Sequence, residues 1–129
     1  MIYLDIALLL ALVQFIVFGA AVGRARARYN CPAPAMSGNE IFERYLRVQM
    51  NTLELLVCLV PAAWLFARYV DANWAAGLVG LYLIGRLVYF RSYVRDPKSR
   101  ALGFGLSSFP IIVMIGGAGI GAVLQLLRG

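Results

Sequence analysis

Long apolar segments alternate with short polar segments along the chain, and this pattern predicts four α-helices. An α-helix needs about 20 mostly apolar residues to cross the hydrocarbon core of a bilayer. The predicted helices cover residues from about 4–24, 41–69, 72–94 and 101–127. The second apolar run starts only at Leu55, so its helix reaches spanning length by beginning in polar sequence near Ile41. We therefore predict an all-α fold, an integral membrane four-helix bundle that forms one domain over residues 1–129.

Turn and capping residues mark the ends of these helices. Residues 29–39 contain two prolines, a serine and a glycine, which predicts a loop. Asn39 is the favoured N-cap of the second helix because its side chain can accept from free N–H groups of the first turn. The spacing of Gly117 and Gly121 is typical of helices that approach each other closely. The rival interpretation, a glycine-rich phosphate loop, requires a preceding strand that the pattern does not contain.

The composition places the chain among membrane proteins. Hydrophobic residues make up 62% of the chain and charged residues 14%, whereas soluble domains contain about half and about a quarter. We expect the first helix to be retained, because a cleaved export signal begins with positive charge. Here the only charged residue before Arg24 is Asp5.

Basic residues give a net charge of +6 and fall mostly on one predicted side of the membrane. Two groups hold ten of the twelve: Arg24, Arg26, Arg28, Arg44 and Arg47, then Arg86, Arg91, Arg95, Lys98 and Arg100. The positive-inside rule makes this side cytoplasmic and puts both termini on the non-cytoplasmic side. We interpret about half of these charges as fixing topology and contacting anionic lipid headgroups, and the net charge does not indicate nucleic-acid binding. The host membrane is a bacterial inner membrane or the endoplasmic reticulum.

The lack of some reactive side chains excludes several kinds of catalytic and metal site. The chain has no histidine and two cysteines, Cys31 and Cys58. This excludes histidine-based metal sites and Ser/His or Cys/His catalysis, and we expect no metal cofactor. Neither cysteine has the surroundings of an activated nucleophile, so an external thiol activated by arginines fits the inventory better.

One stripe of polar side chains lies on the second helix. At 100° per residue, the side chains of one set fall within an arc of roughly 80°: Arg44, Arg47, Asn51, Glu54 and Cys58. Arginine can hold a carboxylate in two-point contact, and a glutamate accepts from an ammonium group. The stripe therefore suits a ligand of both charges, such as an amino acid or small peptide. The alternative is an internal ion-pair network, and Gln49 points to the opposite side of the helix.

A second stripe ends the third helix, where Arg86, Tyr89 and Tyr93 share one face. Arg100 follows seven residues after Tyr93 and joins this face if the turn at Pro97 permits. A tyrosine hydroxyl can donate to a carboxylate or thiolate, and an arginine lowers the pKa of a bound thiol. The alternative is anchoring of Tyr and Arg at the membrane interface. Because both stripes lie on the same membrane side, we favour a pocket.

Two motifs carry a resemblance to a known family. They are Phe42-Glu43-Arg44-x-x-Arg47-x-Gln49-x-Asn51-x-x-Glu54 and Gly85-Arg86-Leu87-x-Tyr89-Phe90-x-x-Tyr93. These motifs resemble the MAPEG family of membrane glutathione enzymes, and most closely its microsomal glutathione transferases and cysteinyl-leukotriene synthase. The resemblance extends over the whole length of the chain.

The resemblance implies a homotrimer that binds glutathione, its co-substrate, between neighbouring subunits near the cytoplasmic surface. The implied glutathione-binding residues are Arg47, Gln49, Asn51, Glu54, Tyr89, Tyr93, Arg24 and Arg28. The implied supporting residues are Arg44, Arg86 and Arg26, and the implied catalytic residue, which stabilises the thiolate, is Arg100. Leu55 stands where the synthase has a tyrosine, so the substrate of the synthase is not assumed.

The sequence thus predicts a membrane glutathione transferase with peroxidase activity on lipid hydroperoxides. Its partners would be glutathione, a hydrophobic electrophile or hydroperoxide from the bilayer, membrane lipids and other copies of the chain, and its role would be detoxification. Two alternatives remain: a non-catalytic scaffold that binds lipids, and a small proton-coupled transporter that uses Glu54 as an intramembrane carboxylate.

Overall fold

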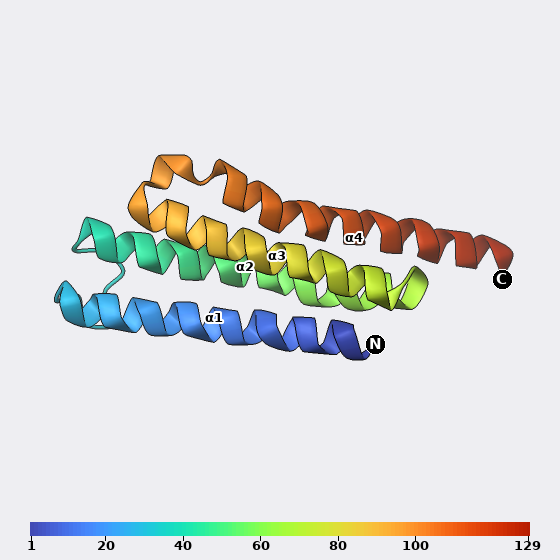
Figure 1. The fold of residues 1–129 in the computed structure, drawn as a ribbon, viewed down its shortest axis with the longest axis horizontal. Helices are drawn as coiled ribbons and strands as arrows, with labels where there is room; N and C mark the ends of the chain where they lie inside the picture. The colour runs from blue at the N-terminus through green and yellow to red at the C-terminus, as the bar shows by residue number, and fades with distance from the viewer.

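Four long helices account for nearly the whole chain (Figure 1). The computed structural model describes all 129 residues. The helices are α1 (Ile2–Arg28), α2 (Glu40–Tyr69), α3 (Ala72–Arg95) and α4 (Ala101–Arg128), with a short 3-10 helix, η1 (Pro97–Ser99), before α4. Each of the four is long and apolar enough to cross a membrane. The predicted all-α four-helix fold is confirmed, and α1 continues four residues beyond the predicted end because its alternating Ala and Arg residues stay helical.

The four helices run antiparallel, with α2 and α3 in the middle and α1 and α4 on opposite sides of that pair (Figure 1). Both termini lie at one end of the bundle, and the α1–α2 loop lies with the α3–α4 turn at the other end. The two basic groups predicted from the sequence therefore share the loop end of the bundle. We call this the basic end.

Side-chain caps begin the two central helices. Asn39 Oδ1 accepts hydrogen bonds from the backbone N–H groups of Ile41 (2.9 Å) and Phe42 (3.1 Å). Asp71 accepts from the N–H of Asn73 at 2.9 Å and begins α3 in the same way. These bonds satisfy N–H groups that have no partner within the helix. The predicted cap at Asn39 is confirmed.

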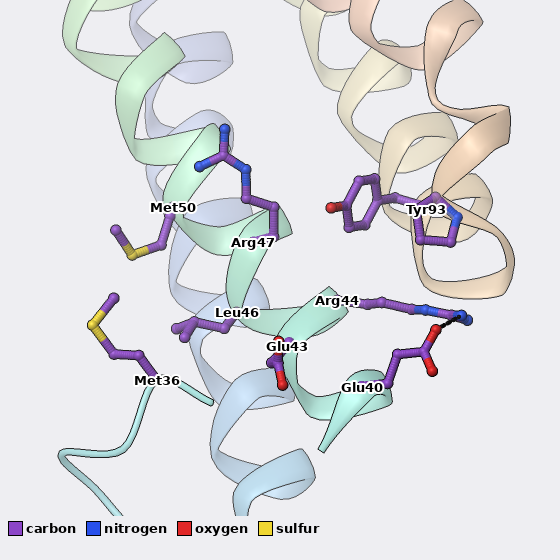
Figure 2. A pocket seen from close by; sticks show the side chains of 9 residues that line it. Met36, Glu40, Glu43, Arg44, Leu46, Arg47, Met50 and Tyr93 are labelled. Carbon is purple, nitrogen blue, oxygen red and sulfur yellow. Dashed lines mark hydrogen bonds and ion pairs between the residues drawn. The ribbon is translucent and has the colours of Figure 1, made fainter. Parts of the chain in front are cut away.

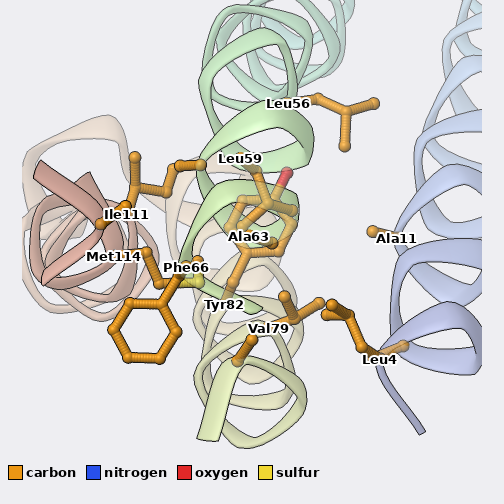
Figure 3. Close-up of a cluster of buried hydrophobic side chains, with 14 residues drawn as sticks. Leu4, Ala11, Leu56, Leu59, Ala63, Phe66, Val79, Tyr82, Ile111 and Met114 are labelled. Carbon is orange, nitrogen blue, oxygen red and sulfur yellow. The ribbon is translucent and has the colours of Figure 1, made fainter. Parts of the chain in front are cut away.

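The largest apolar cluster joins all four helices in the half of the bundle near the termini (Figure 3). Leu4 of α1, Leu59 of α2, Tyr82 of α3 and Met114 of α4 are all fully buried there. The outer surface exposes many large apolar side chains. That surface suits lipid and is unlike a soluble bundle, which covers its exterior with polar groups.

Small residues bring α4 close to α2. A Cβ atom added at Gly117 would lie 2.6 Å from the Phe66 ring, and one added at Gly121 would lie 2.9 Å from Tyr69 Cβ. Both distances are far below van der Waals contact, so a larger residue at either position would force Phe66, Tyr69 or the helix backbones to shift. The close packing predicted from the Gly117–Gly121 spacing is confirmed.

Candidate functional site

A polar groove lies between α2 and the end of α3 at the basic end (Figure 2). Its volume is about 410 Å³, within the usual range for sites that hold small ligands. Arg47 of α2 and Tyr93 of α3 both line it; the Tyr93 hydroxyl points towards α2, and the Arg47 guanidinium extends along α2. Arg47 is exposed and makes no hydrogen bond or ion pair within the chain, so its guanidinium is free to bind an anionic ligand.

Arg44 belongs to the wall of this groove and not to its free surface. Its guanidinium donates to the carbonyl oxygens of Val94 (3.0 Å) and Arg95 (3.3 Å) at the end of α3. It also forms an ion pair with Glu40 at 3.0 Å, one turn earlier on α2. A cation at a helix C-terminus satisfies free carbonyls and complements the helix dipole. Arg44 therefore holds α3 against α2.

Arg86 is fully buried and forms a polar cluster that links α2, α3 and α4. Its Nε donates to Ser107 Oγ (2.8 Å), and its Nη1 donates to Asn51 Oδ1 (2.7 Å) and Thr52 Oγ1 (3.2 Å). Its Nη2 is buried without a partner. We call these four residues, Arg86, Asn51, Thr52 and Ser107, the Arg86 cluster. The cluster contains no carboxylate, so the charge is stabilised by three neutral acceptors.

Close packing of α3 against α4 makes this cluster possible. A Cβ added at Gly85 would lie 2.6 Å from the backbone nitrogen of Ser107, and one added at Gly103 would lie 2.5 Å from Tyr89 Cα. The two glycines therefore let the helix backbones approach each other. This brings the Ser107 hydroxyl within reach of Arg86.

An aromatic row leads from the Arg86 cluster to the groove. The Arg86 guanidinium lies 4.3 Å from the centroid of the Tyr89 ring, a cation–π contact. The Tyr89 ring stacks on that of Tyr93, with centroids 5.4 Å apart. These two contacts connect the buried guanidinium of Arg86 to Tyr93 in the groove through Tyr89.

The other predicted residues of α2 differ in exposure and in their contacts, and only Gln49 lies on another side of the helix from Arg47. Glu54 is exposed about two turns beyond Arg47. Gln49 packs against α1, where a Cβ added at Gly19 would lie 3.0 Å from its Nε2. Asn51 is 8% exposed and belongs to the Arg86 cluster. The sequence offered two interpretations of this stripe, a ligand site and an internal polar network. Arg44 and Asn51 form hydrogen bonds within the chain, as in a network, whereas Arg47 and Glu54 have no partner and remain available to a ligand.

The arginines of α1 are separated from this groove within one chain. Arg24 and Arg28 are exposed and line a groove of about 640 Å³ between α1 and the α2–α3 pair, with Tyr45 of α2 and Phe90 of α3. Arg26 turns towards the α1–α2 loop. There it donates to the carbonyl oxygens of Cys31 (3.1 Å) and Ala35 (2.7 Å), and it lies over the Phe42 ring. Arg26 therefore closes the loop, and its guanidinium is occupied.

Arg100 is exposed and precedes the first residue of α4. The first-turn N–H groups of a helix carry partial positive charge, which adds to that of a nearby guanidinium. This part of the basic end therefore has a positive potential that attracts anions.

An apolar groove of about 590 Å³ lies between α2 and α4, beginning one turn beyond Glu54. Val57 and Leu65 line one wall, and Ile115 and Ala118 line the other. Its lining suits a hydrocarbon group. Cys58 opens onto the same groove and is exposed.

Three polar side chains of structural importance were not identified from the sequence. Thr52 and Ser107 accept from Arg86, and Gln14 of α1 donates from Nε2 to the carbonyl oxygen of Leu83 at 3.0 Å. Their position in the sequence could have identified them, because each is an isolated polar residue in a membrane-spanning segment and such residues often pair with one another. The structure contains no group of three or more side chains suited to hold a metal ion.

Comparison with known proteins gives relatives over most of the chain. Residues 4–120 match the MAPEG family. The chain is 44% identical to an uncharacterized protein of Synechocystis over 118 residues, covering 92% of this chain and 83% of that protein. It is 33% identical to human microsomal glutathione S-transferase 2, covering 80% and 71% of the two chains. It is 31% identical to leukotriene C4 synthase of Cavia porcellus, covering 85% and 73%.

Proposed function

The chain belongs to the MAPEG family, and from that premise we propose that it is a membrane glutathione transferase that also reduces lipid hydroperoxides. Its relatives include proteins named as a glutathione transferase and a leukotriene synthase, which supports a glutathione-dependent membrane enzyme. The observation that carries the proposal is that Arg47, whose guanidinium has no partner within the chain, and Tyr93 line the same groove at the basic end.

In this proposal glutathione binds along the exposed face of α2. Arg47 holds a carboxylate of the tripeptide, Asn51 contributes its amide, and Glu54 accepts from an ammonium or amide group. Tyr89 and Tyr93 complete the site from α3. The charges of the ligand thus meet opposite charges at the membrane boundary, where the tripeptide enters from the cytoplasm.

A homotrimer would bring the remaining predicted residues to this site. Gln49, Arg24 and Arg28 lie on other faces of the protomer than Arg47, so one chain cannot supply all of them to one ligand. A site between subunits would receive Arg47, Asn51 and Glu54 from one protomer and the other three from its neighbour.

Arg100 would activate the sulfur. A thiol with a pKa of about 8.5 is roughly 3% ionised at pH 7, and lowering that pKa by 1.5 units makes about half of it thiolate. In conjugation, the thiolate sulfur bonds to the electrophilic carbon and the leaving group departs with the electron pair of its bond. In peroxide reduction, the thiolate sulfur attacks the terminal oxygen of the hydroperoxide and becomes a sulfenic acid. The O–O bond breaks, and the alkoxide leaves with its electron pair and takes a proton from water to become the alcohol. A second glutathione then converts the sulfenic acid to disulfide and water.

The hydrophobic substrate would approach through the apolar groove between α2 and α4. This groove begins next to Glu54 and continues the face that carries the proposed glutathione site. A substrate dissolved in the bilayer would thus reach the thiolate without crossing water.

A conjugation assay on detergent-purified protein, with glutathione and a generic aryl halide, tests this function. The expected result is conjugate formation that falls at least tenfold in Arg47→Ala and Glu54→Gln. Arg68→Ala is the matched control, because Arg68 is exposed on α2 at the opposite end of the bundle. Wild-type protein that binds hydrophobic ligands without turnover would support a scaffold instead. Proton-coupled uptake into vesicles that depends on Glu54 would support a transporter.

A further inference from the structure

Asn51 has one orientation imposed on it by Arg86. We propose that Arg86 is a positioning residue that keeps the Asn51 amide turned with Nδ2 towards the binding face, so that Asn51 acts on glutathione only as a hydrogen-bond donor. This inference rests on the proposed function for its ligand, whereas the orientation itself follows from the contacts within the chain.

The first step concerns which amide atom faces Arg86. A guanidinium has five N–H donors and no acceptor. The Asn51 atom 2.7 Å from Arg86 Nη1 must therefore be the oxygen. Turning the amide over would place two donors against each other in a fully buried site, where neither has water as a substitute.

The second step concerns the other acceptors of Arg86. Thr52 Oγ1 donates its own hydrogen to the carbonyl oxygen of Val48 (2.7 Å), and Ser107 Oγ donates to that of Gly103 (2.7 Å). Both hydroxyls have only one hydrogen, so their lone pairs are left to face Arg86. The three polar partners of the guanidinium therefore all present acceptor atoms to it, and none directs an N–H or O–H group at it.

The third step concerns the free end of the amide. Asn51 Nδ2 makes no hydrogen bond within the chain, and it is not one of the four buried polar atoms without a partner. It therefore reaches the surface of the protomer. Asn51 lies one turn from Arg47 and from Glu54 on the same face of α2, so a ligand held by these two exposed side chains would lie within reach of its N–H groups. This face offers donors at Arg47 and Asn51 and an acceptor at Glu54.

The test is Asn51→Asp, which keeps the size and shape of the side chain. The carboxylate can still accept from Arg86, but its second oxygen replaces the donor. We expect glutathione affinity, measured by calorimetry on purified protein, to fall at least tenfold. We also expect the KM for glutathione to rise by more than kcat falls, and the unfolding temperature to stay the same or increase. Asn73→Asp is the control, because the same change at an exposed position at the other end of the bundle leaves binding as it is.

A second variant, Arg86→Lys, keeps the charge but has no planar fork to hold the cluster. We expect a lower unfolding temperature together with weaker glutathione binding. If wild-type protein binds glutathione and Asn51→Asp binds it equally well, the donor role is overturned. If Asn51→Asp unfolds at a markedly lower temperature, the assigned orientation is wrong. Absence of glutathione binding by wild-type protein would overturn the proposed function, while the unfolding measurements would still decide the orientation.

Discussion

Replacing Gly103 by alanine tests the packing that holds the Arg86 cluster together. The added Cβ would lie 2.5 Å from Tyr89 Cα and 2.8 Å from Tyr89 Cβ, so the α3 and α4 backbones must separate by about 1 Å to restore ordinary contact. Such overpacking costs about 1–3 kcal/mol. Weakening the 2.8 Å bond between Arg86 and Ser107 adds about 0.5–2 kcal/mol. The higher helix propensity of alanine offsets at most about 1 kcal/mol of this cost. We therefore expect the free energy of unfolding to fall by about 2 kcal/mol.

Gly105→Ala is the matched control for this prediction. Gly105 lies two residues away on α4, and a Cβ added there meets no atom within 4 Å. We expect this variant to be as stable as wild type or more stable by up to about 1 kcal/mol. Unfolding in mixed micelles, followed through the fluorescence of Trp64 and Trp74, measures both. Equal stability of the two variants would refute the close approach of α3 and α4 from which the cluster is derived.

Three further predictions concern the basic end. Arg100→Ala is expected to leave glutathione binding largely intact but to suppress the ultraviolet absorbance of the bound thiolate. The pH at which kcat rises should increase by about one to two units. Unchanged thiolate formation would contradict the role of Arg100. Arg44→Ala removes the bonds to the carbonyl oxygens of Val94 and Arg95 and should lower the unfolding free energy by about 1–3 kcal/mol, which a denaturant titration measures. Asn39→Ala should cost about 1 kcal/mol in the same titration and Asn39→Asp almost nothing, since only the latter keeps an N-cap acceptor; equal losses would argue against the cap.

Features that depend on short stretches of sequence were predictable. The four helices follow from the length of the apolar segments, and the start of α2 follows from the capping chemistry of Asn39. The close approach of α4 to α2 follows from the spacing of Gly117 and Gly121. In each case the physical cause lies within one helix or its immediate flank.

Features that depend on the rotation and spacing of neighbouring helices were not predictable. Helical periodicity put Arg86 on one face with Tyr89 and Tyr93, but it gave no sign that Arg86 turns fully inward while Tyr93 reaches a groove. Ser107 was overlooked because its role exists only where Gly85 and Gly103 let two backbones meet. The assignment of these residues to glutathione remains a prediction.

Arg86 reaches the membrane before its last partner, Ser107, does. An arginine near the centre of an inserting helix costs about 2.5–3.5 kcal/mol. Asn51 and Thr52 belong to α2 and are already present when α3 leaves the ribosome, whereas Ser107 belongs to α4 and arrives last. We expect α2 and α3 to insert as a paired hairpin that shelters the cation, with α4 docking afterwards onto its open side. A chain cut off before α4 would then lack the Ser107 acceptor and would expose this cation to lipid on the side that α4 covers in the complete bundle.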